Sequence, residues 1–167
     1  HINFTEKHFS IGTIPSMKNR TITVNGVSKG FAMTGWRVGF IGAPLWIAKA
    51  CNKIQGQVTS ATCAIAQKAT ERAMLAEPKA ATKEMKETFL RRRDMLIDLL
   101  KDIPGVKCNV PKGAFYLFPD ISYYFGKSYQ NIIIKNANDL CMYLLNNAHV
   151  AFVAGDAFGN PECIRIS

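Results

Sequence analysis

The segment Val27–Phe40 constrains this chain most, because it places two cations among small and apolar residues. It reads VSKGFAMTGWRVGF, with Lys29 directly after Ser28, and Arg37 follows between two glycines. Apolar surroundings of this kind predict a buried segment. Since burying an unpaired charge is costly, the two cations indicate a binding site.

The two cations suit different parts of one ligand. Burial lowers the pKa of a lysine, and a neutral amine attacks carbonyls to form Schiff bases. Arginine stays charged and offers a fork of donors that suits phosphate, while Gly35 and Gly39 allow close approach. An amine-reactive carbonyl with a phosphate describes pyridoxal phosphate. A lone Ser-Lys pair usually marks an exposed turn, but the joint pattern S-K-x5-G-x-R-x-G is much rarer.

Composition excludes several classes of protein. The 167 residues are 48% hydrophobic and 20% charged, which is typical of one globular domain or parts of two. A membrane span is not expected, since no run of eighteen apolar residues occurs. The five cysteines are widely spaced without a C-x-x-C pair, which argues against a disulfide framework or a metal site and favours a reducing cytoplasm. The first residue, His1, and the last segment, CIRIS, predict that both ends are cut.

The net charge of +9 raises the alternative of a basic nucleic-acid-binding module. The basic residues cluster in 79–101, where apolar residues recur at helical spacing on one side. This spacing predicts a solvated amphipathic helix. The segment lacks the aromatic and glycine interleaving of common nucleic-acid modules. Retention on heparin that collapses at modest salt would favour the alternative.

The pattern of elements predicts a mixed α/β chain in two parts. The first part has two short strands followed by helices, and the last part alternates strands with one helix, for which Asn136 is the expected N-cap. A polar loop is expected over 122–131. The predicted strands are 21–26, 37–43, 113–118, 149–155 and 163–167, and the predicted helices are 45–54, 60–76, 79–101 and 136–148.

The segment TVNGVSKGFAMTGWRVGF closely resembles the cofactor-lysine region of class I, fold-type I pyridoxal phosphate-dependent aminotransferases. Its GWRVG form is most similar to the bacterial-type aspartate aminotransferases. PKGAFYLF, VAFVAGDAFG and CIRIS resemble further family segments in the family's order. The resemblance covers essentially the whole chain, as the C-terminal part of such an enzyme.

The resemblance implies roles for four residues. Lys29 would be the catalytic lysine that carries pyridoxal 5'-phosphate, and Ser28 and Arg37 would hold the cofactor's phosphate. Arg165 would pair with the α-carboxylate of the amino acid. Strand alternation in CIRIS supports the last role independently, because it puts the two isoleucines on one face and Arg165 on the other.

The resemblance also implies an architecture. Residues 1–76 would be the C-terminal part of the large cofactor-binding domain, with apolar surface exposed. Residues 77–167 would form the long connecting helix and a small α+β C-terminal domain. Relatives of this kind are homodimers with sites at the subunit interface, and Gln57–Gln67 resembles a stretch near that interface.

The implied activity moves an amino group between an amino acid, aspartate by family resemblance, and 2-oxoglutarate. Two departures matter. Many relatives carry a hydroxyl residue where this chain has Gly26. No match is present to the family's upstream aspartate, tyrosine and asparagine, so the 167 residues alone are expected to be inactive. A related fold-type I enzyme, a lyase or a decarboxylase-like member, stays open as an alternative.

Overall fold

The computed structural model describes residues 2–5, 7–75 and 79–167. The chain divides into two compact units, one ending at Met85 and one containing Ile2–Thr5 and Lys86–Ser167. This division falls within the long helix α3, Lys79–Lys101, whose predicted limits are confirmed. The domain boundary predicted between residues 76 and 77 lies outside the described residues.

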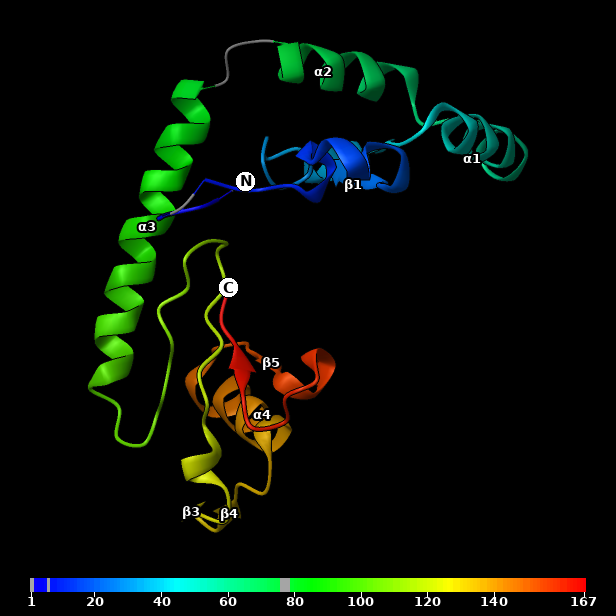
Figure 1. Ribbon diagram of the computed structural model, residues 1–167. Helices are drawn as coiled ribbons and strands as arrows, with labels where there is room; N and C mark the ends of the chain where they lie inside the picture. The colour runs from blue at the N-terminus through cyan, green and yellow to red at the C-terminus, as the bar shows by residue number, and fades with distance from the viewer. Residues whose placement is uncertain (1, 6, 76–78) are drawn as a thin grey trace. The chain divides into compact units, whose positions relative to one another are not determined.

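The unit that ends at Met85 is built on an antiparallel strand pair. Strands β1 (Thr23–Gly26) and β2 (Gly39–Gly42) pair from Thr23↔Gly42 to Gly26↔Gly39. Helices α1 (Leu45–Val58) and α2 (Ala64–Leu75) follow β2 in the chain (Figure 1). These strands and helices were predicted, with slightly different limits. Short 3-10 helices occupy Ile11–Thr13, Pro15–Arg20 and Thr34–Trp36.

The apolar residues of this unit are mostly exposed. Its buried cluster is small and consists of Val27, Val38 and Ala66, with Phe31 and Met33 packed against it. The predicted exposure of apolar surface is therefore confirmed. The exposed side chains on α1 and α2 include Leu45, Trp46, Ile54, Val58, Ile65 and Leu75.

The other unit has its core around α4, Ala137–Ala148 (Figure 1). The Asn136 side chain accepts a hydrogen bond from the Asp139 N–H at 2.9 Å, which confirms the predicted N-cap. The Asp139 carboxylate in turn accepts from the Lys135 N–H at 3.0 Å. The first bond satisfies an N–H group that the first helical turn leaves unpaired, and the second ties the residue before the N-cap to the helix. The buried residues of this core cluster are Ile121, Ala137, Cys141 and Ile164.

Strand β6 (Ile164–Arg165) pairs antiparallel with β5 (Val153–Ala154) on one side. On its other side it lies against residues 117–120, and the Ile164 N–H donates to the Pro119 carbonyl at 3.1 Å. The strand predicted over 113–118 is wrong, because only isolated bridges form at Gly113 and Leu117. Proline has no N–H, so the buried Pro119 interrupts a ladder. The strand predicted over 149–155 likewise shrinks to β5.

The loop predicted over 122–131 contains more structure than expected. A 3-10 helix spans Ser122–Tyr124, and β3 (Ser128–Tyr129) forms a hairpin with β4 (Ile132–Ile133). The two residues between these strands have positive φ angles of 48° and 64°. Two consecutive positive φ angles give a type I′ turn, the favoured hairpin turn. This turn carries Gln-Asn instead of the usual Asn-Gly, so its sequence signal is weak.

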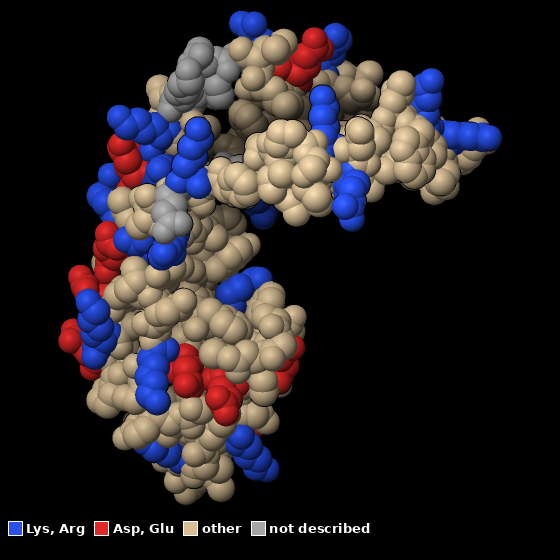
Figure 2. Space-filling view, in the orientation of Figure 1, with Lys and Arg blue, Asp and Glu red and all other residues tan. Residues whose placement is uncertain are grey.

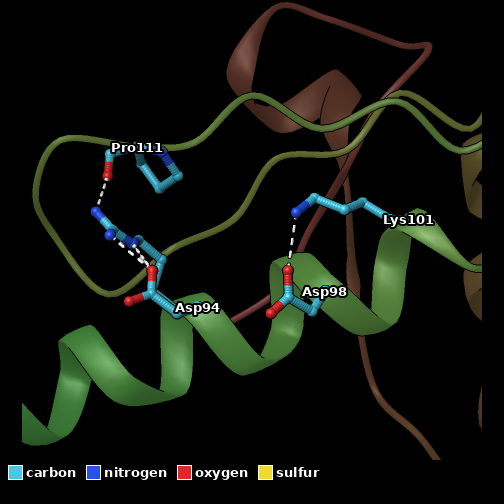
Figure 3. Close-up of polar contacts among 5 residues, drawn as sticks. Asp94, Asp98, Lys101 and Pro111 are labelled. Atoms are coloured by element: carbon cyan, nitrogen blue, oxygen red, sulfur yellow. Dashed lines mark hydrogen bonds and ion pairs between the residues drawn. The ribbon is translucent and has the colours of Figure 1, made fainter.

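Charges of both signs lie along α3 (Figure 2). The Lys101 ammonium is 2.8 Å from the Asp98 carboxylate, and the Arg93 guanidinium is 2.7 Å from that of Asp94 (Figure 3). Arg93 also donates to the Pro111 carbonyl at 2.9 Å. This mixed charge favours the solvated-helix interpretation over a nucleic-acid stripe. Among the described residues, no helix is long and apolar enough to cross a membrane and no metal-ligand cluster occurs.

Replacing Gly105 by alanine is expected to destabilise the unit that contains it by about 2–4 kcal/mol. Gly105 has a φ of 81°, and a Cβ at this position would overlap the ring of Tyr123. Both backbone strain and overpacking therefore oppose the substitution. The free energy of unfolding, measured by urea denaturation, tests this prediction.

Gly126 provides the matched control. Its φ is 80°, but a Cβ at this position would meet nothing within 4 Å. Gly126→Ala should therefore show only the backbone cost, about 1–2 kcal/mol. Equal losses for both variants would mean that the Tyr123 ring does not restrict Gly105.

Candidate active site

The first group of predicted site residues lies at one end of the β1–β2 pair. The Val27 N–H donates to the Val38 carbonyl at 3.4 Å, one step beyond the last strand pair. Ser28 lies in the turn that follows Val27, and Arg37 directly precedes Val38. Lys29 follows in the turn after β1. The local fold thus brings these three residues to one end of a single hairpin.

The expected burial of the two cations is wrong. Lys29 and Arg37 are both exposed in the structure, and the buried positions are Val27 and Val38. The physical reason is local. Lys29 lies in a turn, whereas the two valines continue the strand pair and pack on α2 through Ala66.

Arg37 has an unusual backbone conformation, with φ 55° and ψ 48° in the left-handed region. Its guanidinium donates to the Thr34 carbonyl at 2.8 Å. A left-handed conformation is uncommon for a residue with a Cβ, and such strain often accompanies function. Arg37 is the C-cap of the short helix Thr34–Trp36, so the end of this helix sets the conformation of its backbone.

Arg37 lines an open hollow of 590 Å³ beside the hairpin end. Sequence reasoning missed Cys63, which shares this hollow. The N–H groups of Ala66 and Ile65 lower the pKa of the Cys63 thiol, as expected at the start of a helix. The helix was predicted to begin earlier, at residue 60, which concealed the position of this cysteine. The other lining residues are Ala32, Gly35, Trp36, Ile65 and Ala66.

Gly26, where many relatives carry a hydroxyl residue, has little room for a side chain. A Cβ at this position would lie 3.0 Å from the Val38 carbonyl oxygen. The glycine is therefore compatible with the close strand pairing at this end of the hairpin.

Arg165 lies in the other unit, on β6. It is partly buried, and its guanidinium carbon is 4.8 Å from the ring centroid of Tyr116 and 4.7 Å from that of Phe158. Among the described residues its Nε is buried without a hydrogen-bond partner. Ile164 and Ile166 line an apolar cavity of 680 Å³ whose lining does not include Arg165. The predicted alternation of the two faces is confirmed.

The structure therefore assigns three of the predicted residues to one unit and the fourth to the other. Ser28, Lys29 and Arg37 belong to the unit that ends at Met85, and Arg165 belongs to the unit of Lys86–Ser167. The two units carry different chemistry. One contains a hydroxyl, an amine and a guanidinium, and the other contains a guanidinium whose buried Nε is unpaired among the described residues.

Comparison with known proteins decides the family. The profile described as aminotransferase class I and II matches residues 1–167. The chain belongs to the aminotransferase class I and II family. This match confirms the resemblance seen in the sequence. Class I aminotransferases are pyridoxal phosphate-dependent transferases.

Individual class I and II aminotransferases are similar over almost the whole chain. An aspartate aminotransferase of Pinus pinaster is 46% identical over 164 residues, covering 96% of this chain and 33% of the relative. A bifunctional aspartate and glutamate/aspartate-prephenate aminotransferase of Petunia hybrida is 48% identical over 165 residues, covering 96% of this chain and 34% of the relative. The chain therefore spans about a third of the length of these curated relatives.

Solved aminotransferase structures match the fold. The aspartate aminotransferase of Rhizobium meliloti has a TM-score of 0.91 and 44% identity, covering 99% of this chain and 42% of that one. An aromatic aminotransferase of Pyrococcus horikoshii has a TM-score of 0.87 and 37% identity, covering 99% and 43%.

The residues present fit the aminotransferase cofactor. A phosphate ester accepts hydrogen bonds from a hydroxyl and a guanidinium, which Ser28 and Arg37 supply at the hairpin end. An aldehyde reacts with an amine, which Lys29, the residue after Ser28, would supply. The donor set thus fits both the phosphate and the aldehyde of pyridoxal phosphate.

Proposed function

We propose that the complete protein carrying this chain is a pyridoxal phosphate-dependent aminotransferase that uses aspartate and 2-oxoglutarate. The observation that carries the proposal is the hairpin end with Ser28, Lys29 and Arg37. The relatives support aspartate, since several are named aspartate aminotransferases. 2-Oxoglutarate is the acceptor that the family resemblance implies.

Each residue has a separate task in the proposed reaction. Ser28 Oγ and the Arg37 guanidinium hold the phosphate of the cofactor and so fix its orientation. The bound cofactor supplies an electron sink for negative charge at the substrate's α-carbon. Lys29 Nζ accepts the α-proton as general base and returns it as general acid. Arg165 binds the α-carboxylate through a bidentate pair of hydrogen bonds, which both holds and orients the substrate.

We also propose the family's architecture for this chain. Residues 1–76 would close the large cofactor-binding domain, and residues 77–167 would form the connecting helix and the small domain. Homodimerisation through the region of Gln57–Gln67 is supported by the exposure of Val58 (73%) and Ile65 (74%). A cytoplasmic location is supported by the five free cysteines.

The test of function is an assay of the purified complete protein with pyridoxal phosphate, aspartate and 2-oxoglutarate. Glutamate and oxaloacetate should form in equal amounts. Loss of carbon dioxide or ammonia from the amino acid without glutamate would replace the proposal with a decarboxylase or lyase. A panel of other amino acids would rank the substrates.

Arg37→Ala is expected to raise the dissociation constant for pyridoxal phosphate by about 10- to 150-fold, because a hydrogen bond to a charged group contributes roughly 1.5–3 kcal/mol. Alanine also has a Cβ, so the backbone strain at this position stays similar. Equilibrium dialysis of the apoprotein against the cofactor measures the change.

Arg20→Ala is the control for net charge. Arg20 lies in the same unit at the end of the 3-10 helix Pro15–Arg20, before β1, whereas the proposed cofactor residues follow β1. This variant should bind the cofactor normally. An equal loss in both variants would indicate a general effect of charge and would contradict the assignment of Arg37.

A further inference from the structure

We propose that Tyr116 and Phe158 are positioning residues that hold the Arg165 guanidinium and leave its N–H edge available to the substrate carboxylate. The inference rests on the proposed function, because it concerns how the same arginine is presented. It assigns a task to two aromatic residues that do not themselves bind substrate.

Both rings contact the same cation. The guanidinium carbon of Arg165 lies 4.8 Å from the ring centroid of Tyr116 and 4.7 Å from that of Phe158. Both distances fall within the range of a cation–π interaction. Arg165 is only partly exposed, so water screens these contacts less than it would at an open surface.

The strand register explains why Tyr116 faces Arg165. The bridges Leu117↔Ile166 and Asp120↔Cys163 share one antiparallel register, which sets Phe118 opposite Arg165. Since side chains alternate along an extended chain, residues 116 and 118 face the same side as Arg165. The intervening Leu117 is buried on the opposite side.

Phe158 reaches the arginine from a different segment. It ends the 3-10 helix Gly155–Phe158, which follows β5. Its ring meets that of Phe118 edge-on, with centroids 5.9 Å apart and planes at 90°. Edge-to-face contact is a favoured arrangement of aromatic rings, so Phe118 supports Phe158 from the side.

The loop that carries Phe158 is tightly closed. The Gly155 N–H donates to the Cys163 carbonyl at 2.8 Å, and the Asn160 N–H donates to the Gly155 carbonyl at 3.1 Å. A Cβ at Gly155 would overlap the carbonyl oxygens of Asn160 and Cys163. Glycine is therefore required at this close approach, and the closed loop fixes the position of Phe158.

Aromatic contacts suit a guanidinium that must bind an anion. A protein carboxylate on Arg165 would occupy its N–H donors and compete with the substrate. Rings attract the charge through their faces and accept none of the in-plane hydrogen bonds that a carboxylate needs. In the described part of the chain, the buried Nε of Arg165 has no hydrogen-bond partner, so no protein carboxylate occupies this donor.

The experiment compares Tyr116→Leu and Phe158→Leu with the unsubstituted complete protein. Each is expected to raise KM for the amino acid and the oxo acid by about 3- to 30-fold, the range that a cation–π contact corresponds to. The kcat should change by less than about threefold, because neither ring touches the reacting atoms. Tyr116→Phe and Phe158→Tyr keep the rings and should restore KM.

Two further measurements separate positioning from a structural role. An amine that lacks the α-carboxylate should react with the cofactor-loaded protein at the same rate in all variants. Tyr123→Leu removes a different ring–cation contact, with Lys127, and should leave KM unchanged. If the leucine variants slow the amine equally, or if the ring-keeping variants fail to restore KM, the proposal is overturned.

The test distinguishes this inference from the proposed function. If the unsubstituted protein does not transaminate, the proposed function fails. If it transaminates and Arg165→Lys raises KM while the two leucine variants do not, only the positioning role fails. Phe158 is 47% exposed, so its replacement is compatible with folding.

Discussion

Replacing Lys29 by alanine in the complete protein is expected to lower kcat by about 10²- to 10⁴-fold, the range that general acid–base catalysis contributes. Alanine has no amine to accept the α-proton and return it. Pyridoxal phosphate should still bind, because Ser28 and Arg37 keep the phosphate contacts at the hairpin end. Steady-state kinetics and equilibrium dialysis of one preparation measure both quantities.

Two variants sharpen the test of Lys29. Lys29→Arg keeps the positive charge, but arginine does not lose its proton near neutral pH, so turnover should stay as low as in the alanine variant. Lys53→Ala removes an exposed lysine on α1 and should leave turnover unchanged. Near-normal kcat in Lys29→Ala would exclude the lysine from the proton transfer.

That Ser28, Lys29 and Arg37 lie close to the ends of two short strands could be predicted from the sequence, because local residue patterns mark both strands. The antiparallel strands β1 and β2 are joined by residues 27–38, and residues just beyond the last strand pair then lie at one end of the pair. Burial could not be predicted in the same way. Apolar neighbours suggested a buried lysine, but the turn exposes Lys29 and the strand positions bury Val27 and Val38.

The surroundings of Arg165 were predictable only in part. The period-two pattern of CIRIS gave the faces of β6 correctly, because alternation is a property of one strand. The two rings that contact Arg165 come from separate segments. Tyr116 belongs to the stretch before Pro119 that forms only isolated bridges, and Phe158 belongs to the closed loop after β5. Their meeting depends on register between distant residues, which local patterns do not specify.

The limits of a helix could be predicted from the sequence where the apolar periodicity extends over several turns. The prediction of 79–101 was confirmed because apolar spacing over several turns leaves little ambiguity. The short strands were harder. β3 and β4 are two residues each and join through a Gln-Asn turn, so neither alternation nor a glycine marked them.

Arg165→Ala in the complete protein is expected to lower kcat/KM for amino and oxo acids by about 30- to 5,000-fold, corresponding to roughly 2–5 kcal/mol for a truncated charge pair. The loss should appear mainly as a raised KM, since the contact holds the carboxylate in both the bound and the reacting state. Initial-rate kinetics over a wide range of substrate concentration separate the two constants.

Arg165→Lys tests whether geometry or charge matters at this position. Lysine keeps the charge but lacks the planar fork, so it cannot make the two parallel hydrogen bonds to a carboxylate. A flat guanidinium beside the rings of Tyr116 and Phe158 is also better matched than an ammonium. KM should therefore stay well above that of the unsubstituted protein. If kcat/KM were unchanged toward every amino acid tested in Arg165→Ala, the arginine would be structural, and its unpaired Nε would need another partner.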